Sequence, residues 1–173
     1  DVDGTIEATA AAGGELEIKT RAHRRSNMRI IVMMDVGGSM DPHALLCSRL
    51  FSALKKSSHF RDLRTYYFHN CVYGQVFETS DFKEPKSVAS LIRECSSEYR
   101  LIILGDALMA PYELMSPGGA IVYGRESIEQ KEGIEWLADL RDHFSKSAWL
   151  NPETPSYWHG TAAYIGRLFP MYP

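Results

Sequence analysis

Asp35 and Asp106 are the residues whose types and positions could hold a metal ion. Asp35 opens the segment Asp35-Val-Gly-Gly-Ser39, and Asp106 stands between a glycine and an alanine. Carboxylate and hydroxyl oxygens are the ligands that hard divalent cations such as Mg²⁺ prefer. Asp35, Ser39 and Asp106 would supply three such groups, and water or a partner's carboxylate would complete the shell. A lone aspartate after a strand is often only a helix cap, so the prediction depends on the pattern occurring twice.

Two continuous apolar runs must position these aspartates. Residues 29–34 precede Asp35, and residues 100–104 precede Asp106 with one glycine between. A run without alternation is typical of a parallel strand that is covered on both faces. In open α/β sheets the ligand site lies at the carboxyl ends of the strands. If the two strands are parallel neighbours, we therefore expect both carboxylates to face one cleft.

The rest of the chain alternates strands with helices. We predict further strands and helices over residues 5–12 (helix), 42–56 (helix), 63–69 (strand), 72–77 (strand), 86–95 (helix), 127–144 (helix), 147–150 (strand) and 157–168 (helix). The short turn at Asn70 predicts an antiparallel hairpin with residues 72–77 at the sheet edge. His69 and Asn70 are predicted to hydrogen-bond within that turn, although they could also lie near Asp35. The predicted fold is α/β: a doubly wound, mostly parallel open sheet with one antiparallel edge strand and helices on both faces.

Composition bounds the possible functions. The 173 residues suffice for one domain, 1–173, which we expect to be part of a longer protein because no methionine opens it. A net charge of −3 gives no electrostatic reason to expect nucleic acid as a partner. No apolar run approaches the ~18–20 residues of a membrane span. Three widely spaced cysteines favour reduced thiols and a cytoplasmic protein over a disulfide or zinc framework.

The segment Asp35-Val-Gly-Gly-Ser39, taken with the strand before Asp106, resembles a von Willebrand factor type A (VWA) domain and its metal-ion-dependent adhesion site (MIDAS). Most of the chain is also similar to a bacterial subgroup related to the CoxE proteins. The stretches that carry this second likeness are Gly13-Gly-Glu-Leu16, Phe68-His-Asn-Cys71, Gly105-Asp-Ala-Leu-Met-Ala-Pro-Tyr-Glu-Leu114, Trp149-Leu-Asn-Pro152 and Leu168-Phe-Pro-Met-Tyr-Pro173.

The resemblance implies a Rossmann-like fold, one divalent ion (Mg²⁺ or Mn²⁺) and a role in protein–protein contact without catalysis. On the family's pattern the ligands are Asp35, Ser39 and Asp106, and a carboxylate of the protein partner completes the metal shell. The resemblance also implies a cytoplasmic role in protein maturation or chaperone-like assembly, beside a MoxR-type AAA+ ATPase.

Two departures from the family's pattern leave alternatives open. Gly37 stands where the loop's first serine is expected, so only its backbone is available there. The family's threonine has no clear counterpart, and Thr79, Ser80 and Ser87 lie in the corresponding region. One alternative is therefore a metal-free scaffold with a degenerate MIDAS. Another is a metal-assisted phosphohydrolase with Asp35 as nucleophile, which lacks the expected second aspartate because Gly37 occupies its position.

Overall fold

The computed structural model describes residues 1–20, 27–57, 59–117 and 131–173. In these residues, seven strands form one sheet in the order β4-β3-β2-β1-β5-β6-β7. The strands are β1 (Met28–Asp35), β2 (Phe60–Phe68), β3 (Gln75–Phe77), β4 (Pro85–Ser87), β5 (Arg100–Leu104), β6 (Lys146–Leu150) and β7 (Met171–Tyr172). Strands β2, β1, β5, β6 and β7 pair in parallel, and β3 runs antiparallel to both of its neighbours.

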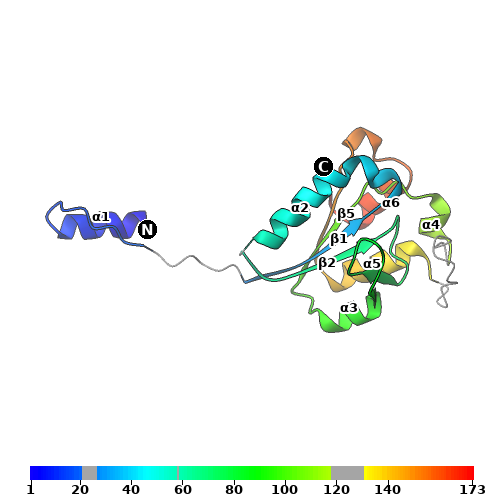
Figure 1. Cartoon of the computed structure of the whole chain (residues 1–173), viewed down its shortest axis with the longest axis horizontal. Coiled ribbons are helices and arrows are strands. Elements are labelled where there is room, and N and C mark those ends of the chain that lie inside the picture. The colour runs from blue at the N-terminus through cyan, green and yellow to red at the C-terminus, as the bar shows by residue number, and fades with distance from the viewer. Residues whose placement is uncertain (21–26, 58, 118–130) are drawn as a thin grey trace.

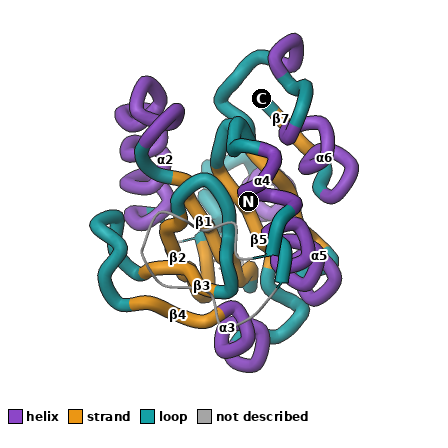
Figure 2. The backbone as a smooth tube through the Cα atoms, turned by 90° about the vertical axis from the view of Figure 1, so that its right-hand side faces the viewer, coloured by secondary structure: helices purple, strands orange, loops and turns teal. Residues whose placement is uncertain are grey.

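Helices cover both faces of the sheet, and β1 shows why (Figures 1 and 2). Ile31 and Met33 pack into the core cluster that holds helices α3 (Val88–Glu94), α5 (Gly133–His143) and α6 (Thr161–Leu168). The alternate residues, among them Val32 and Met34, belong to a second cluster under helix α2 (Ala44–Lys56). A strand buried on both faces has no polar side, which explains its unbroken apolar run. The predicted fold class is confirmed.

The connections after β1 and β5 are shaped by a few backbone positions. Gly37 and Gly38 have φ of 86° and 58°, so the chain turns sharply into a short 3₁₀ helix, η1 (Gly38–His43), before α2 begins. After β5, Pro111 opens the short helix α4 (Pro111–Met115) at a position where its missing N–H costs nothing. Both connections lie at the carboxyl edge of the sheet.

Several boundaries differ from the sequence-based predictions. The edge strand is β4, not residues 72–77, because Gln75–Phe77 pairs on its outer side with Pro85–Ser87. The predicted last helix begins later, at Thr161, after Gly160 turns the chain with φ of 59°. Helix α5 begins at Gly133, and residues 127–130 of the predicted helix lie outside the described residues. The two-residue strand β7 was too short to show a pattern.

The N-terminal helix α1 (Val2–Ala11) is capped by Asp1, whose side chain accepts a hydrogen bond from the backbone N–H of Gly4 at 3.1 Å. None of its residues is buried against the described part of the chain. Among the described residues, no helix combines the length and the apolar character that crossing a membrane requires.

Candidate metal centre

Asp35 and Asp106 lie at the same edge of the sheet because β1 and β5 are parallel neighbours. Their register pairs Met34 with Leu104, which brings Asp35 next to Gly105. A Cβ added at Gly105 would lie 3.0 Å from the Asp35 Cβ, so the absent side chain allows this approach. The structure thus confirms that the two strands are neighbours, which was the condition for a shared cleft.

The Asp35 carboxyl group is buried, with 3% of the residue exposed. Its Oδ1 accepts a hydrogen bond of 2.8 Å from the backbone N–H of Asn70. Burial, with a smaller contribution from the nearby carboxylates of Asp106 and Glu113, raises the pKa of Asp35 to about 8, and the hydrogen bond from Asn70 opposes this rise. A raised pKa means that the folded protein favours the protonated form, because burial removes the water that would stabilise the charge.

Asp106 is equally buried, with 2% exposed. Its Oδ1 accepts a hydrogen bond of 2.9 Å from the backbone N–H of Leu108. Its Oδ2 is buried and has no hydrogen-bond donor among the residues that the structure describes. Such an oxygen is costly unless something outside the chain pairs with it. Two under-compensated buried carboxylates side by side fit the requirements of a divalent cation.

Glu113 is a third buried acid at this edge, and sequence analysis gave it no role. Its Oε1 accepts from the Asn70 side-chain amide at 2.8 Å, and its Oε2 accepts from the backbone N–H of Ala110 at 2.8 Å. The second bond caps helix α4, whose N-cap residue is Ala110. A glutamate three residues after an N-cap is a known sequence signal for such a contact, so this role of Glu113 could have been predicted. Glu113 therefore ties the loop after β2 to the loop after β5.

The His69 carbonyl accepts from the N–H of Cys71 within the turn at 2.7 Å, as predicted, but the side chains of His69 and Asn70 bond across the site. The Nδ1 of His69 donates to the backbone carbonyl of Val36 at 2.7 Å, because a carbonyl can only accept. A Cβ added at Gly37 would lie 3.4 Å from this Nδ1, so the imidazole lies against the glycine turn. Asn70 has a φ of 58°, and Ala107, next to Asp106, has a φ of 59°. Left-handed non-glycine residues at both loops are the kind of strain that functional sites retain.

Three buried side chains hold the loop of Asp106 in place. The Asn151 amide donates to the Asp106 carbonyl at 2.8 Å, and the Trp149 indole donates to the Gly105 carbonyl at 2.7 Å. The Thr161 hydroxyl lies 2.8 Å from the carbonyl oxygen of Ala107 and 3.0 Å from that of Met109. Strand β6 and helix α6 thereby fix the position of the Asp106 carboxylate.

Of the remaining predicted ligands, Ser39 lies on the loop that follows Asp35, whereas Thr79 and Ser87 have other roles. Ser39 is exposed in η1, on the loop that follows Asp35, and Gly37 lies between them. Thr79 instead closes the turn between β3 and β4, where its hydroxyl accepts from the backbone N–H of Lys83 at 3.0 Å. Ser87 caps α3 by accepting from the backbone N–H of Ser90 at 3.1 Å.

Ser87 is therefore not brought to the site, and the Thr79 hydroxyl is already used within its own turn. Strand β4 is separated from β1 by two strands, which corresponds to roughly 14 Å across the sheet. Ser80 is an exposed residue of the same β3–β4 turn. Asn70, which was not among the residues considered for the family's threonine, contacts Asp35 through its backbone N–H. Within the described ranges, no cluster of three or more His, Cys, Asp or Glu side chains has the arrangement of a metal site, so an ion here depends on hydroxyl groups and water.

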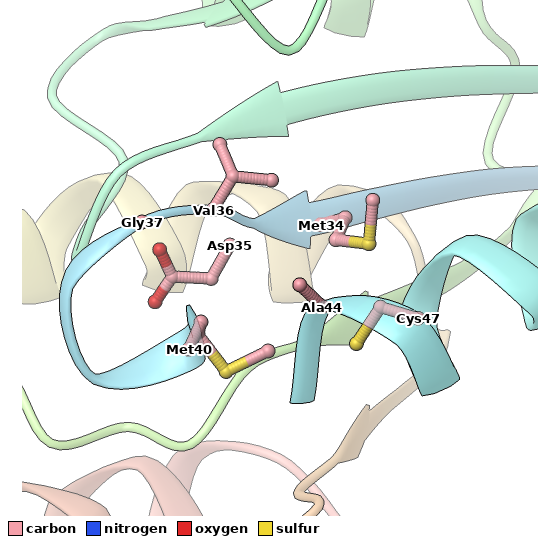
Figure 3. Close-up of a pocket in the computed structure, with 7 residues that line it drawn as sticks. All are labelled: Met34, Asp35, Val36, Gly37, Met40, Ala44 and Cys47. Carbon is pink, nitrogen blue, oxygen red and sulfur yellow. The ribbon is translucent and has the colours of Figure 1, made fainter. Parts of the chain in front are cut away.

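A cavity of about 80 Å³ lies beside Asp35 (Figure 3). Its lining comes from the end of β1, the glycine turn and the start of α2, and consists of Met34, Asp35, Val36, Gly37, Met40, Ala44 and Cys47. The carboxylate of Asp35 points toward the turn at Gly37, while Met34 and Cys47 lie on the opposite side of the cavity.

Comparison with known proteins agrees with this geometry. Residues 1–170 match the family model described as "VWA domain containing CoxE-like protein". The chain belongs to this family. No curated protein and no solved structure matches it. The mostly parallel sheet with helices on both faces is the Rossmann-like fold expected of a VWA domain, and membership supports a module for protein interaction or metal binding.

Proposed function

We propose that this VWA domain is a protein-binding module whose partner docks at the carboxyl edge of the sheet, over a divalent cation shared by Asp35 and Asp106. The observation that carries the proposal is the buried Asp106 Oδ2, which lacks a donor among the described residues, beside a second buried carboxylate with a strongly raised pKa. A cation compensates both groups, whereas a metal-free scaffold would leave Asp106 Oδ2 without a donor among the described residues and would keep Asp35 protonated.

Asp35 and Asp106 would bind the ion directly, and the Ser39 hydroxyl would add an oxygen from the exposed side. The ion would be Mg²⁺ or Mn²⁺, which prefer oxygen ligands and retain water where the protein supplies few. Gly37 contributes no side chain, so the ion keeps open positions that a partner's carboxylate could fill. The hydrogen bond between Asn70 and Glu113 would keep the loop after β2 and the loop after β5 in fixed positions relative to each other.

The surface around this edge supports docking. In the described residues from 27 onward, the large hydrophobic side chains that are strongly exposed lie in α2, the loop before α4, α4, η3 (Pro155–Tyr157), α6 and β7. They are Leu45, Leu46, Leu108, Tyr112, Tyr157, Tyr164 and Tyr172. Leu45, Leu46, Leu108, Tyr112 and Tyr157 lie in the segments that follow the carboxyl ends of β1, β5 and β6, and exposed apolar and aromatic side chains of this kind are typical of a protein interface.

The partner we propose is a MoxR-type AAA+ ATPase, with which the domain would act in maturation or chaperone-like assembly in the cytoplasm. We propose no catalysis. The phosphohydrolase alternative needs a second acid two residues after Asp35, and Gly37 stands there with φ of 86°. Turnover of a generic phosphate ester with Mg²⁺ that disappears in Asp35→Asn would favour that alternative instead.

The test is capture of partners from the source cell by the tagged wild type, Asp35→Ala and Ser87→Ala, each with Mg²⁺ or with EDTA. Ser87→Ala is the matched control because it removes an oxygen of the predicted set that lies three strands away. We expect an ATPase to be recovered by the wild type and the control with Mg²⁺ only. Equal recovery by Asp35→Ala, with its fold intact by circular dichroism, would contradict the proposal.

A further inference from the structure

The amino edge of the sheet carries a row of cations. Strands β2, β1, β5 and β6 are neighbours and run parallel, so their first residues lie at the same edge. Each of these strands has a positively charged residue at its first or second position: Arg61, Arg29, Arg100 and Lys146. Along β1, Arg29 lies six residues before Asp35, which corresponds to roughly 20 Å. The row of cations is therefore at the opposite edge from the candidate metal centre.

A cleft of about 470 Å³ opens at this amino edge. Among the described residues that line it, three are the cations Arg29, Arg61 and Lys146, and one is the acid Glu98. The register between β1 and β2 skips Arg61. Such a bulge changes the direction of the side chain that it contains, which explains how Arg61 lines the same cleft as Arg29.

The positive charge of the cleft is weakly compensated. The side chain of Glu98 is 79% exposed, and its Oε2 lies 3.5 Å from the Nη1 of Arg29, which is a long contact for an ion pair. The Arg29 guanidinium lies over the ring of Tyr99, 5.8 Å from the centroid, and is thereby held at the cleft. The nearby carboxylate of Asp62 already accepts hydrogen bonds from the Tyr99 hydroxyl and from Arg64, so it is not available to the cleft.

Arg100 and Lys146 occupy directly paired positions on β5 and β6. Both are exposed, and neither has an ion-pair partner among the residues that the structure describes. The ordinary explanation is that strand ends are solvated. However, like charges at paired strand positions are destabilising, and the chain as a whole carries a net charge of −3, so a basic composition is not the cause. Natural sequences depart from such local rules mainly at functional sites.

We propose that this cleft, together with Arg100 beside it, binds an extended acidic segment of a partner protein. The four cations enter on four neighbouring strands and span three strand spacings, roughly 14 Å, which is the length of about four extended residues. A single phosphate ion would reach part of that row. Arginine guanidinium groups pair with carboxylates through two parallel hydrogen bonds, and the weak contact of Glu98 can be exchanged for such a pair.

This binding requires no metal ion, and it takes place at the other edge of the sheet from the docking surface of the proposed function. One domain can therefore hold two partners at once, one over the cation and one at the amino edge. The two contacts can be tested separately, because EDTA acts on the first contact and charge reversal at the amino edge acts on the second.

The test is fluorescence anisotropy of a fluorescein-labelled, ten-residue peptide of alternating aspartate and glutamate, titrated with the whole chain in EDTA. We expect binding that weakens as NaCl is raised, since salt screens exposed charges. Lys146→Glu should weaken binding by at least about fivefold, because an exposed ion pair contributes up to about that factor and reversal adds a repulsion of similar size. The new glutamate would lie opposite Arg100, so the melting temperature should not fall.

Lys83→Glu is the matched control, because it changes the net charge equally at an exposed lysine, whose side chain is 74% exposed, in the turn between β3 and β4. Equal loss of affinity in Lys146→Glu and Lys83→Glu, or no binding by the wild type, would overturn the proposal. Tighter binding of a ten-nucleotide oligothymidylate than of the peptide would indicate a nucleic acid instead, and complete displacement by inorganic phosphate would indicate a site for small anions. Either result would also overturn it. Asp35→Asn should lose Mn²⁺ but keep the peptide, so failure of this proposal and failure of the proposed function are distinguishable.

A measurement on the unsubstituted protein covers the case in which a variant does not fold. Amide hydrogen exchange with and without the peptide should show protection in residues 97–101 and 145–148, where the cleft opens. Residues 35–40 and 106–115, at the carboxyl edge, should exchange as before. Protection confined to the carboxyl edge, or no protection at residues 97–101, would overturn the proposal.

Discussion

Asp35→Asn should change how the stability of the metal-free domain depends on pH. Burial, with the nearby carboxylates of Asp106 and Glu113, raises the pKa of Asp35 from 3.8 to about 8 in the folded protein. Asparagine resembles the protonated acid and keeps an oxygen that can accept from the backbone N–H of Asn70, a bond of 2.8 Å. The substitution therefore removes a titration without removing the hydrogen bond.

The direction of the effect follows from proton binding. Between pH 4 and pH 8 the folded wild type holds a proton on Asp35 that the unfolded chain has released, so stability decreases as pH rises. The free energy of unfolding should fall by about 1.4 kcal/mol per pH unit, or about 3 kcal/mol from pH 5 to pH 7. Below pH 4 both states are protonated and the contribution is fully present.

Urea unfolding in EDTA, at half-unit steps from pH 4.5 to pH 8, measures this. The relevant quantity is the difference between wild type and Asp35→Asn, because other titrating groups cancel in it. Asp62 is such a group: hydrogen bonds from Tyr99 and Arg64 lower its pKa, so its stabilisation is lost as pH falls. We expect Asp35→Asn to become progressively the more stable protein as pH rises. If the difference in the free energy of unfolding between the two proteins does not change with pH, the raised pKa of Asp35 is refuted.

Three further substitutions test the parts that position the site. Asn70→Gly keeps the left-handed backbone but leaves Glu113 without its amide donor, so urea unfolding should show a loss of about 1–3 kcal/mol; no loss would mean that the 2.8 Å bond is not formed. Gly105→Ala places a Cβ 3.0 Å from that of Asp35 and should both destabilise the fold by about 1–3 kcal/mol and weaken Mn²⁺ binding by calorimetry. Unchanged affinity would contradict that close approach. Thr161→Val removes the one hydroxyl proton that the carbonyls of Ala107 and Met109 share, and it should cost about 1 kcal/mol in thermal unfolding. An unchanged melting temperature would show that this bond does not hold the loop.

The sequence predicted the parts of the fold that follow from burial alone. The runs before Asp35 and Asp106 read as central strands because both faces of each strand are covered, and residues 100–104 were predicted with the bounds that the structure shows. Strand β4 could not be predicted in this way. Pro85–Ser87 has no apolar pattern, and it pairs only because the turn at Thr79 returns the chain to β3.

The candidate site was predictable only where its residues follow strands. Asp35 and Asp106 carry that signal, and parallel pairing then brings them together. Glu113 and Asn70 lie 43 residues apart, and the bond between them depends on how two loops pack. Thr79 and Ser87 show the converse: a hydroxyl in the expected region of the sequence is used for a turn or a helix cap.

The most direct test of the shared cation is titration of the wild type, Asp35→Asn, Asp106→Asn and Ser87→Ala with Mn²⁺, followed by calorimetry and by the electron paramagnetic resonance of the free ion. We predict one site per chain in the wild type and in Ser87→Ala, and its loss in both aspartate variants while their folds are retained. Binding that survives in both aspartate variants, or that is absent from the wild type, would contradict the account.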